Sequence, residues 1–274
     1  MGSLPDGDYA DFMLACTRAM LPAARANLAA VLALVEKGKI RCSESTSRPS
    51  AASQRAIAQV LEGGDFYPDH EIQAFAWPLL LQAGGLANGP KLALTARGRA
   101  ARTKDPDEVL RALWERWVAK GIIDELARLE QIKGQRSAHV LSALGTRRRA
   151  ASTAIELLAV DEFVEIDRLF DQVTAVAPFT SARKERATWK FYIEHPQYGS
   201  LGYADSDFPG VVDRRYLMAL LFEYAATLGV VDVRYVRPEG AQADVERFNL
   251  YDPNAPISRY DGLLQVRATL LTRV

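Results

Sequence analysis

Residues 77–86 read Trp-Pro-Leu-Leu-Leu-Gln-Ala-Gly-Gly-Leu, and residues 91–95 read Lys-Leu-Ala-Leu-Thr. A leucine-rich stretch that ends at a glycine pair predicts a buried helix, because glycine readily takes the left-handed conformation that ends helices. The apolar and polar alternation that follows predicts a short strand. The same order returns in the second half, where Tyr-Leu-Met-Ala-Leu-Leu-Phe at 216–222 is followed by a glycine at 229 and a strand at 231–235.

Helix, glycine and strand in this order are typical of the last helix and the wing of a winged-helix unit. Two copies predict an α+β, mostly helical protein made of two winged-helix units. The expected organisation is an N-terminal part at 1–104 with the first unit, a helical connector at 105–145, and a second unit with an inserted loop and strand region at 146–274. A chain of 274 residues is long enough for each unit to bury its own core.

The composition is that of an ordinary globular protein. Lys and Arg number 34, as do Asp and Glu, so the net charge favours no partner and any attraction to nucleic acid must come from local patches. The two cysteines, Cys16 and Cys42, predict free thiols in a reducing compartment. No run approaches the roughly 18–20 apolar residues of a membrane span, and no basic segment opens the chain as in a secretion signal. We therefore expect a cytoplasmic protein with no membrane partner.

Three helix starts are predicted by capping residues. Ser50 and Asp69 each precede a helical pattern, and Asp105 precedes a proline and two acids, which suit the positive end of the helix dipole. The helix after Asp105 has a buried stripe that includes two tryptophans, and its pattern continues beyond Gly121 to Ile132. We interpret this long helix as the connector that packs the two halves together.

Catalysis has little support in the sequence. His70, His139 and His195 stand far apart, and none has a partner at metal-ligand spacing, so each is interpreted as a surface or capping residue. A phosphate-binding loop and a His-Glu-x-x-His motif are both missing, and residues 199–202 are better explained as a hairpin turn than as a nucleophile turn. The sequence thus predicts no catalytic residue, no metal site and no cofactor.

Two windows without acidic residues are the candidate DNA-binding surfaces. In a chain of balanced charge, such windows are where phosphate is attracted, although a solvated basic face balanced by nearby acids would look the same. The first window, between Glu71 and Asp105, contains Lys91, Arg97, Arg99, Arg102 and Lys104. The second window, between Glu130 and Glu156, contains Lys133, Arg136, Arg147, Arg148 and Arg149.

Four further arginines are candidates for DNA contact. Arg214 and Arg215 open the repeated helix and could face a major groove, or they could pair with acids such as Asp213 and Glu223. Arg48 and Arg55 belong to a serine-rich segment at a helix start, where backbone N–H groups favour phosphate.

Aromatic residues gather near position 190 and could stack nucleic-acid bases if they are exposed. Alternating aromatics on a strand are more often part of a core. The set consists of Trp189, Phe191, Tyr192, Tyr198 and Tyr203.

Residues 92–99 read Leu-Ala-Leu-Thr-Ala-Arg-Gly-Arg and precede a tryptophan-containing helix at 110–117. This pattern resembles bacterial tandem winged-helix proteins described as helicase-associated, which are similar to the N-terminal region of XPB-type helicases. The resemblance continues at Tyr203, 215–217 and 227–232, and it implies a non-catalytic protein beside a DNA-processing ATPase in repair or phage defence. The chain departs from the pattern at 268–274, so we expect an incomplete or altered second wing.

The leading hypothesis is a double-stranded DNA-binding adaptor of a larger DNA-processing complex, with a protein partner that is either a helicase-type ATPase or a second copy. It predicts that changing Arg147, Arg148 and Arg149 to Glu abolishes DNA binding without unfolding the protein. The alternatives are a winged-helix protein-interaction scaffold, indicated by an exposed apolar patch, and a ligand-responsive transcription regulator, indicated by a pocket near the connector.

Overall fold

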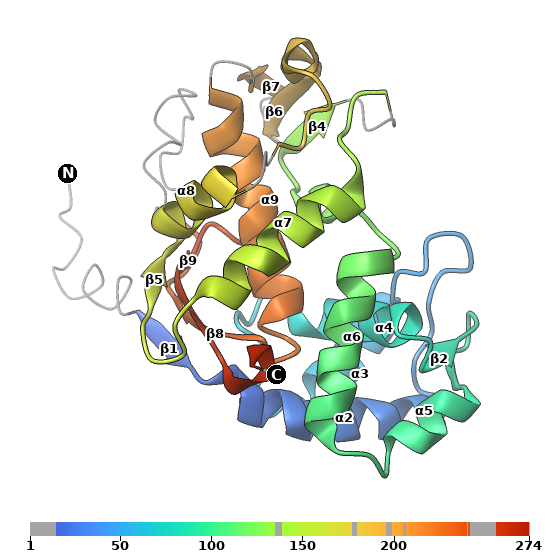
Figure 1. The fold of residues 1–274 in the computed structure, drawn as a ribbon. Helices are drawn as coiled ribbons and strands as arrows, with labels where there is room; N and C mark the ends of the chain where they lie inside the picture. The colour runs from blue at the N-terminus through green and yellow to red at the C-terminus, as the bar shows by residue number, and fades with distance from the viewer. Residues whose placement is uncertain are drawn as a thin grey trace, which may run out of the picture.

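The computed structural model describes residues 15–134, 139–176, 180–195, 199–204, 207–239, 241 and 256–273. The protein is α+β, with more helix than strand (Figure 1). In the described part of the chain, no helix has the length and apolar character needed to cross a membrane.

The first half contains helices α2, α3 and α4 followed by a small hairpin. The backbone at Arg41 pairs with Lys91, just before the second hairpin strand, so the segment after α2 lies next to that strand. The elements of this half are β1 (Cys16–Arg18), α2 (Met20–Glu36), α3 (Ala51–Ala58), α4 (Gln73–Ala83), β2 (Ala87–Asn88) and β3 (Ala93–Leu94).

The start of α4 differs from the prediction. Asp69 does not cap this helix; instead the carboxylate of Asp65 accepts hydrogen bonds from the backbone N–H groups of Ile72, Gln73 and Ala74, at 2.9–3.1 Å. These are donors that the first turn of a helix leaves without an intrahelical partner. Capping from seven to nine residues upstream cannot be recognised from the local sequence pattern.

Two of the predicted caps are confirmed. The side chain of Ser50 accepts from the N–H of Ser53 and caps α3, and Asp105 caps α6 (Pro106–Lys120). The hydroxyl of Thr95 accepts from the N–H of Gly98 and caps α5 (Ala96–Ala101). The predicted continuation beyond Gly121 is wrong: α6 ends there, and η1 (Glu125–Arg128) and β4 (Ile132–Gly134) follow. A Cβ at Gly121 would lie 2.1 Å from the guanidinium of Arg148, so a close approach occupies the space beside the bend.

The second half has helices α7 and α8, an inserted hairpin, a long buried helix and two strands. The long helix is continuous through η4 (Pro209–Asp213), α9 (Arg214–Ala219) and η5 (Leu220–Ala225), of which η4 and η5 have the wider π-type turns. Residues 199–202 lie within strand β7 and do not form the predicted turn. The other elements are α7 (Leu144–Leu157), β5 (Val164–Glu165), α8 (Ile166–Val176), η2 (Glu185–Lys190), β6 (Phe191–His195), β7 (Gly199–Tyr203), β8 (Val231–Tyr235), β9 (Leu263–Ala268) and η7 (Leu270–Thr272).

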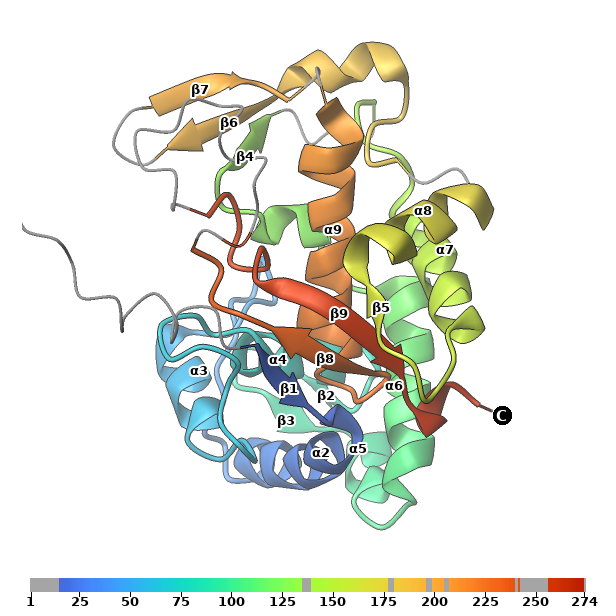
Figure 2. The ribbon, with the colours of Figure 1, turned by 90° about the vertical axis from the view of Figure 1, so that its left-hand side faces the viewer.

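The two halves share one order of elements. In the second half β9 lies between β5 and β8, so the last strand occupies the middle of the three, and all pairs are antiparallel. In the first half β3 likewise pairs with β2, and Lys91 at its start pairs with the segment at Arg41. Each half therefore runs helix, extended segment, two helices and two strands, with the same strand order. The sheet β4-β6-β7 is separate and stands at one end of the molecule (Figure 2).

A single hydrophobic core joins the halves. Helix α6 packs against α2 and α4 of the first half and against α7 of the second, as expected of a connector. Trp117 of α6 stacks on Tyr224 of η5 with ring centroids 4.0 Å apart. Strand β1, from the start of the described chain, pairs with β8 at the edge of the second-half sheet.

Candidate nucleic-acid interface

Neither of the two repeated helices, α4 and α9, offers a face to a ligand. In α4, residues 73–81 are all buried, and in α9 every residue except Arg214 is buried. A helix that reads a major groove must expose several side chains to base edges. Base recognition through either helix is therefore incompatible with this structure.

Arg215 and Arg214 pair with acids and do not face a groove. The Nε of Arg215 lies 2.8 Å from Oδ1 of Asp261, and both side chains are fully buried. Arg214 pairs with Asp167 and is only 15% exposed. The prediction of a groove contact is thus wrong for Arg215. The structure favours the alternative of ion pairing, but the partners are Asp261 for Arg215 and Asp167 for Arg214, and not the neighbouring acids.

Arg147 and Arg148 are also buried, which corrects their assignment as DNA-binding residues. Arg147 pairs with Asp124 at 2.6 Å and lies over the ring of Tyr216. Arg148 donates from Nε to Oε1 of Glu125 at 2.7 Å and lies over the ring of Trp117. Burial lowers the pKa of Arg148, but the neighbouring carboxylate of Glu125 more than offsets this, so the pKa is raised and the guanidinium stays charged.

Glu125 is the centre of this buried network. Besides Arg148, its carboxylate accepts hydrogen bonds from Nε1 of Trp117 and from the hydroxyl of Tyr216, each at 2.9 Å. A second buried carboxylate, Glu223, pairs with Arg128. These groups join α6 and η1 to α7 and to the long helix, so Arg147 and Arg148 of the second acid-free window belong to the internal framework and not to a DNA surface.

The other described cations of the second window, Lys133 and Arg149, lie on different elements. Arg149 is exposed on α7, and Lys133 is half-buried on β4. Arg136 lies outside the described residues.

The first window does form a cationic surface, beside the β2–β3 hairpin. Lys37, Lys91 and Arg99 line one open hollow of about 460 Å³; we call these three residues the hairpin surface. The guanidinium of Arg99 donates to the carbonyl oxygen of Leu94 at 2.7 Å, which holds it over the hairpin. Glu36 also lines the hollow, and it pairs with Arg102 at 2.5 Å.

Other predicted residues lie apart from the hairpin surface. Arg97 and Lys104 line a separate depression between α5 and α6, together with Glu108. Arg55 is exposed on α3, and Arg48 is half-buried in the preceding loop. Lys37 was not among the predicted residues, because it precedes Glu71 and so lies outside both windows. Its position at the end of α2, near the segment at Arg41 that pairs with Lys91, is the sequence feature that could have indicated it.

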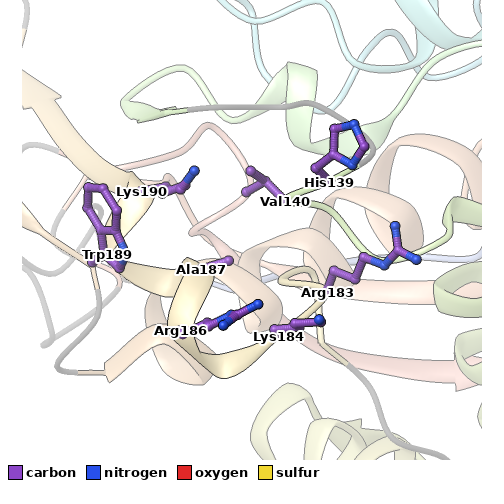
Figure 3. A pocket seen from close by; sticks show the side chains of 8 residues that line it. All are labelled: His139, Val140, Arg183, Lys184, Arg186, Ala187, Trp189 and Lys190. Atoms are coloured by element: carbon purple, nitrogen blue, oxygen red, sulfur yellow. The ribbon is translucent and has the colours of Figure 1, made fainter.

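A second cationic hollow was not predicted. It has a volume of about 740 Å³ and lies beside η2, at the end of the molecule opposite α2 and α5 (Figures 1 and 2). Because Glu185 interrupts the run of cations, these residues do not form an acid-free window in the sequence. The residues that line it are His139, Val140, Arg183, Lys184, Arg186, Ala187, Trp189 and Lys190 (Figure 3), and we call it the η2 hollow.

One backbone pairing and one side-chain contact position this hollow. Leu141 and Ala182 form an antiparallel bridge, and the N–H of Arg183 donates to the carbonyl oxygen of Val140 at 2.7 Å. The carboxylate of Asp213, at the end of η4, accepts from the N–H of Ser181 at 2.6 Å. The start of η2 is therefore tied to the buried helix.

Asp213 makes the stability of this region depend on pH. Burial raises its pKa to about 6, against hydrogen bonds from Ser181 that lower it. Between about pH 4 and 6 the folded state keeps a proton that the unfolded state releases, so this group's contribution to stability falls as the pH rises, by about 3 kcal/mol in total.

We expect the free energy of unfolding of the wild type, relative to that of Asp213→Asn, to decrease from pH 4.5 to 7 in urea titrations. A difference that stays constant or increases over this range would contradict the assignment.

Nucleophilic and metal chemistry find little support in the described residues. No group of three or more His, Cys, Asp or Glu side chains within them is placed to hold a metal ion. Cys16 and Cys42 are free, and burial raises the pKa of the Cys42 thiol to about 11, which disfavours the reactive thiolate.

Comparisons of the chain with family models, with curated proteins and with solved structures give no match.

Proposed function

We propose that this protein is a non-catalytic tandem winged-helix adaptor that binds double-stranded DNA through the hairpin surface, within a larger DNA-processing complex. The observation that supports it most is the convergence of Lys37, Lys91 and Arg99 on one hollow beside a hairpin. Cationic side chains on a concave surface focus attraction for phosphate, even in a protein with no net charge.

The repeated topology supports the winged-helix part of the proposal. In each half a hairpin follows the third helix, and its last strand pairs with the segment between the first two helices. The predicted glycine stops have the expected backbone: Gly85 and Gly229 have φ of +67° and +70°. Pairs β2–β3 and β8–β9 would then be the two wings.

Burial of the third helices supports a sequence-tolerant mode of binding. Contacts to phosphate position a protein on a duplex but carry no sequence information directly. With α4 and α9 inside the core, the exposed cations near the hairpin are left to contact the backbone. The protein would therefore bind duplexes of different sequence with similar affinity.

Fluorescence anisotropy of a labelled duplex of roughly 30 base pairs, titrated at several salt concentrations, tests the proposal. Each phosphate contact is expected to contribute about −0.9 to the slope of log K against log salt, so the three cations predict a slope of about −3 or steeper. Duplexes of unrelated sequence should give the same slope. Absence of binding at low salt would contradict the proposal.

A protein partner is the second candidate, favoured by an apolar area near the C-terminal segment. Leu157 and Leu270 are 70% and 67% exposed, and Arg273 donates to the carbonyl oxygen of Leu158, which brings the two segments together. Exposed apolar area of this kind marks interaction sites. Stable self-association in sedimentation without DNA, combined with no duplex binding, would favour this function.

A further inference from the structure

The η2 hollow combines features that the proposed function does not use. Four of its eight lining residues are Lys or Arg, and none is acidic. Its lining also includes Val140 and Ala187, which are apolar and buried. Lys184 and Arg186 are exposed, and no carboxylate in the described part of the chain forms an ion pair with either.

Trp189 gives this hollow a planar apolar wall. Its side chain is 55% exposed and borders the cavity (Figure 3), and the ammonium of Lys190 lies 5.5 Å from its ring centroid. An exposed indole beside cations is the arrangement that proteins use to stack a nucleobase while they hold its phosphate. Lysine and arginine supply charge-assisted hydrogen bonds to phosphate oxygens.

The size and shape of the hollow favour a flexible ligand. Its volume of about 740 Å³ lies within the usual range of small-ligand sites, so a nucleotide can enter it. A duplex keeps its bases stacked inside, whereas a single strand can turn a base outward onto an aromatic ring.

We propose that the η2 hollow binds a nucleotide unit of single-stranded nucleic acid, with the base on Trp189 and the phosphate between Lys184 and Arg186. This inference goes beyond the proposed function, because the hollow lies at the end of the molecule opposite the hairpin surface (Figures 1 and 2). It stands whether or not the hairpin surface binds duplex.

Tryptophan fluorescence provides a direct test, because the four tryptophans differ in exposure. Trp77, Trp114 and Trp117 are 0%, 8% and 0% exposed, so a ligand that quenches the emission on contact reports on Trp189. The full chain is titrated with a thymidine oligonucleotide of about 12 bases, within the range of known single-strand sites. An abasic oligomer of the same length and charge is the matched probe without bases.

The expected result is saturable quenching by the thymidine oligomer and binding at least fivefold weaker by the abasic oligomer, since stacking contributes strongly to affinity. Trp189→Ala should remove the quenching and weaken binding at least fivefold in anisotropy. Lys184→Gln with Arg186→Gln should weaken binding and reduce its salt dependence. The control pair Arg116→Gln with Lys120→Gln, at exposed positions outside the η2 hollow and the hairpin surface, should leave single-strand binding unchanged.

A third titration, with thymidine monophosphate, distinguishes a nucleotide that belongs to a strand from a free nucleotide. Quenching by the oligomer alone supports a strand, and equal quenching by the monophosphate assigns the hollow to a free nucleotide. Absence of quenching by both, or equal binding of the abasic oligomer, would overturn the proposal. In the variant Lys91→Gln with Arg99→Gln, loss of duplex binding with quenching by the thymidine oligomer retained would show that this site is separate from the hairpin surface.

Discussion

Glu125→Ala is expected to lower the free energy of unfolding by about 3–5 kcal/mol, the cost of breaking a buried ion pair by removing one partner. The carboxylate is fully buried and accepts from Arg148, Trp117 and Tyr216. Its removal takes this acceptor away from Nε of Arg148, from the indole N–H and from the hydroxyl. Urea unfolding followed by circular dichroism measures the loss.

Two controls separate this network from general effects of substitution. Arg149→Ala, at the exposed neighbour of Arg148, should change stability by no more than about 0.5 kcal/mol. The double variant Glu125→Leu with Arg148→Met should be less destabilised than the sum of the single variants, because it leaves no unpaired charge. A Glu125→Ala protein as stable as the wild type would contradict the central position of this carboxylate.

The same network changes the expected outcome of replacing Arg147, Arg148 and Arg149 with Glu. From the sequence alone, this variant is expected to lose DNA binding and stay folded. The structure places Arg147 and Arg148 in ion pairs with Asp124 and Glu125, so each reversed charge would face an acid in the interior. We now expect the triple variant to unfold, which makes it unsuitable as a test of DNA contact.

Replacing Lys37, Lys91 and Arg99 together with Gln is expected to weaken duplex binding by roughly 500-fold at about 0.1 M salt. Each lost phosphate contact removes about 0.9 from the salt slope, which is roughly an eightfold effect at that concentration, and the three effects multiply. All three side chains line one hollow at the surface, so the fold should remain intact. Anisotropy with the same labelled duplex, over several salt concentrations, measures both quantities.

A control variant with the same change in net charge shows whether the location matters. Arg116, Lys120 and Arg149 are exposed and lie outside the hairpin surface and the η2 hollow. Their replacement with Gln should reduce affinity far less than the hairpin triple does. Equal losses in the two triples would mean that net charge alone matters and would contradict the assignment of the hairpin surface.

Local sequence rules predicted most of the elements that depend on a few neighbouring residues. Ser50 and Asp105 cap the helices expected of them, and the predicted strand at 231–235 is present. Gly229 has the expected positive φ. These features follow from backbone sterics and from hydrogen bonds that span three residues or fewer, which the sequence displays directly.

The sequence by itself determined the mixed α+β class, the repeated order of elements and the balance of charge. Only the tertiary structure decided which cations meet water. Arg215 and Arg149 look alike in the sequence, yet the first is buried against Asp261, 46 residues away, and the second is exposed. The physical reason is that desolvation is acceptable for an arginine only where distant segments supply a carboxylate, and such pairing arises from packing across the whole fold.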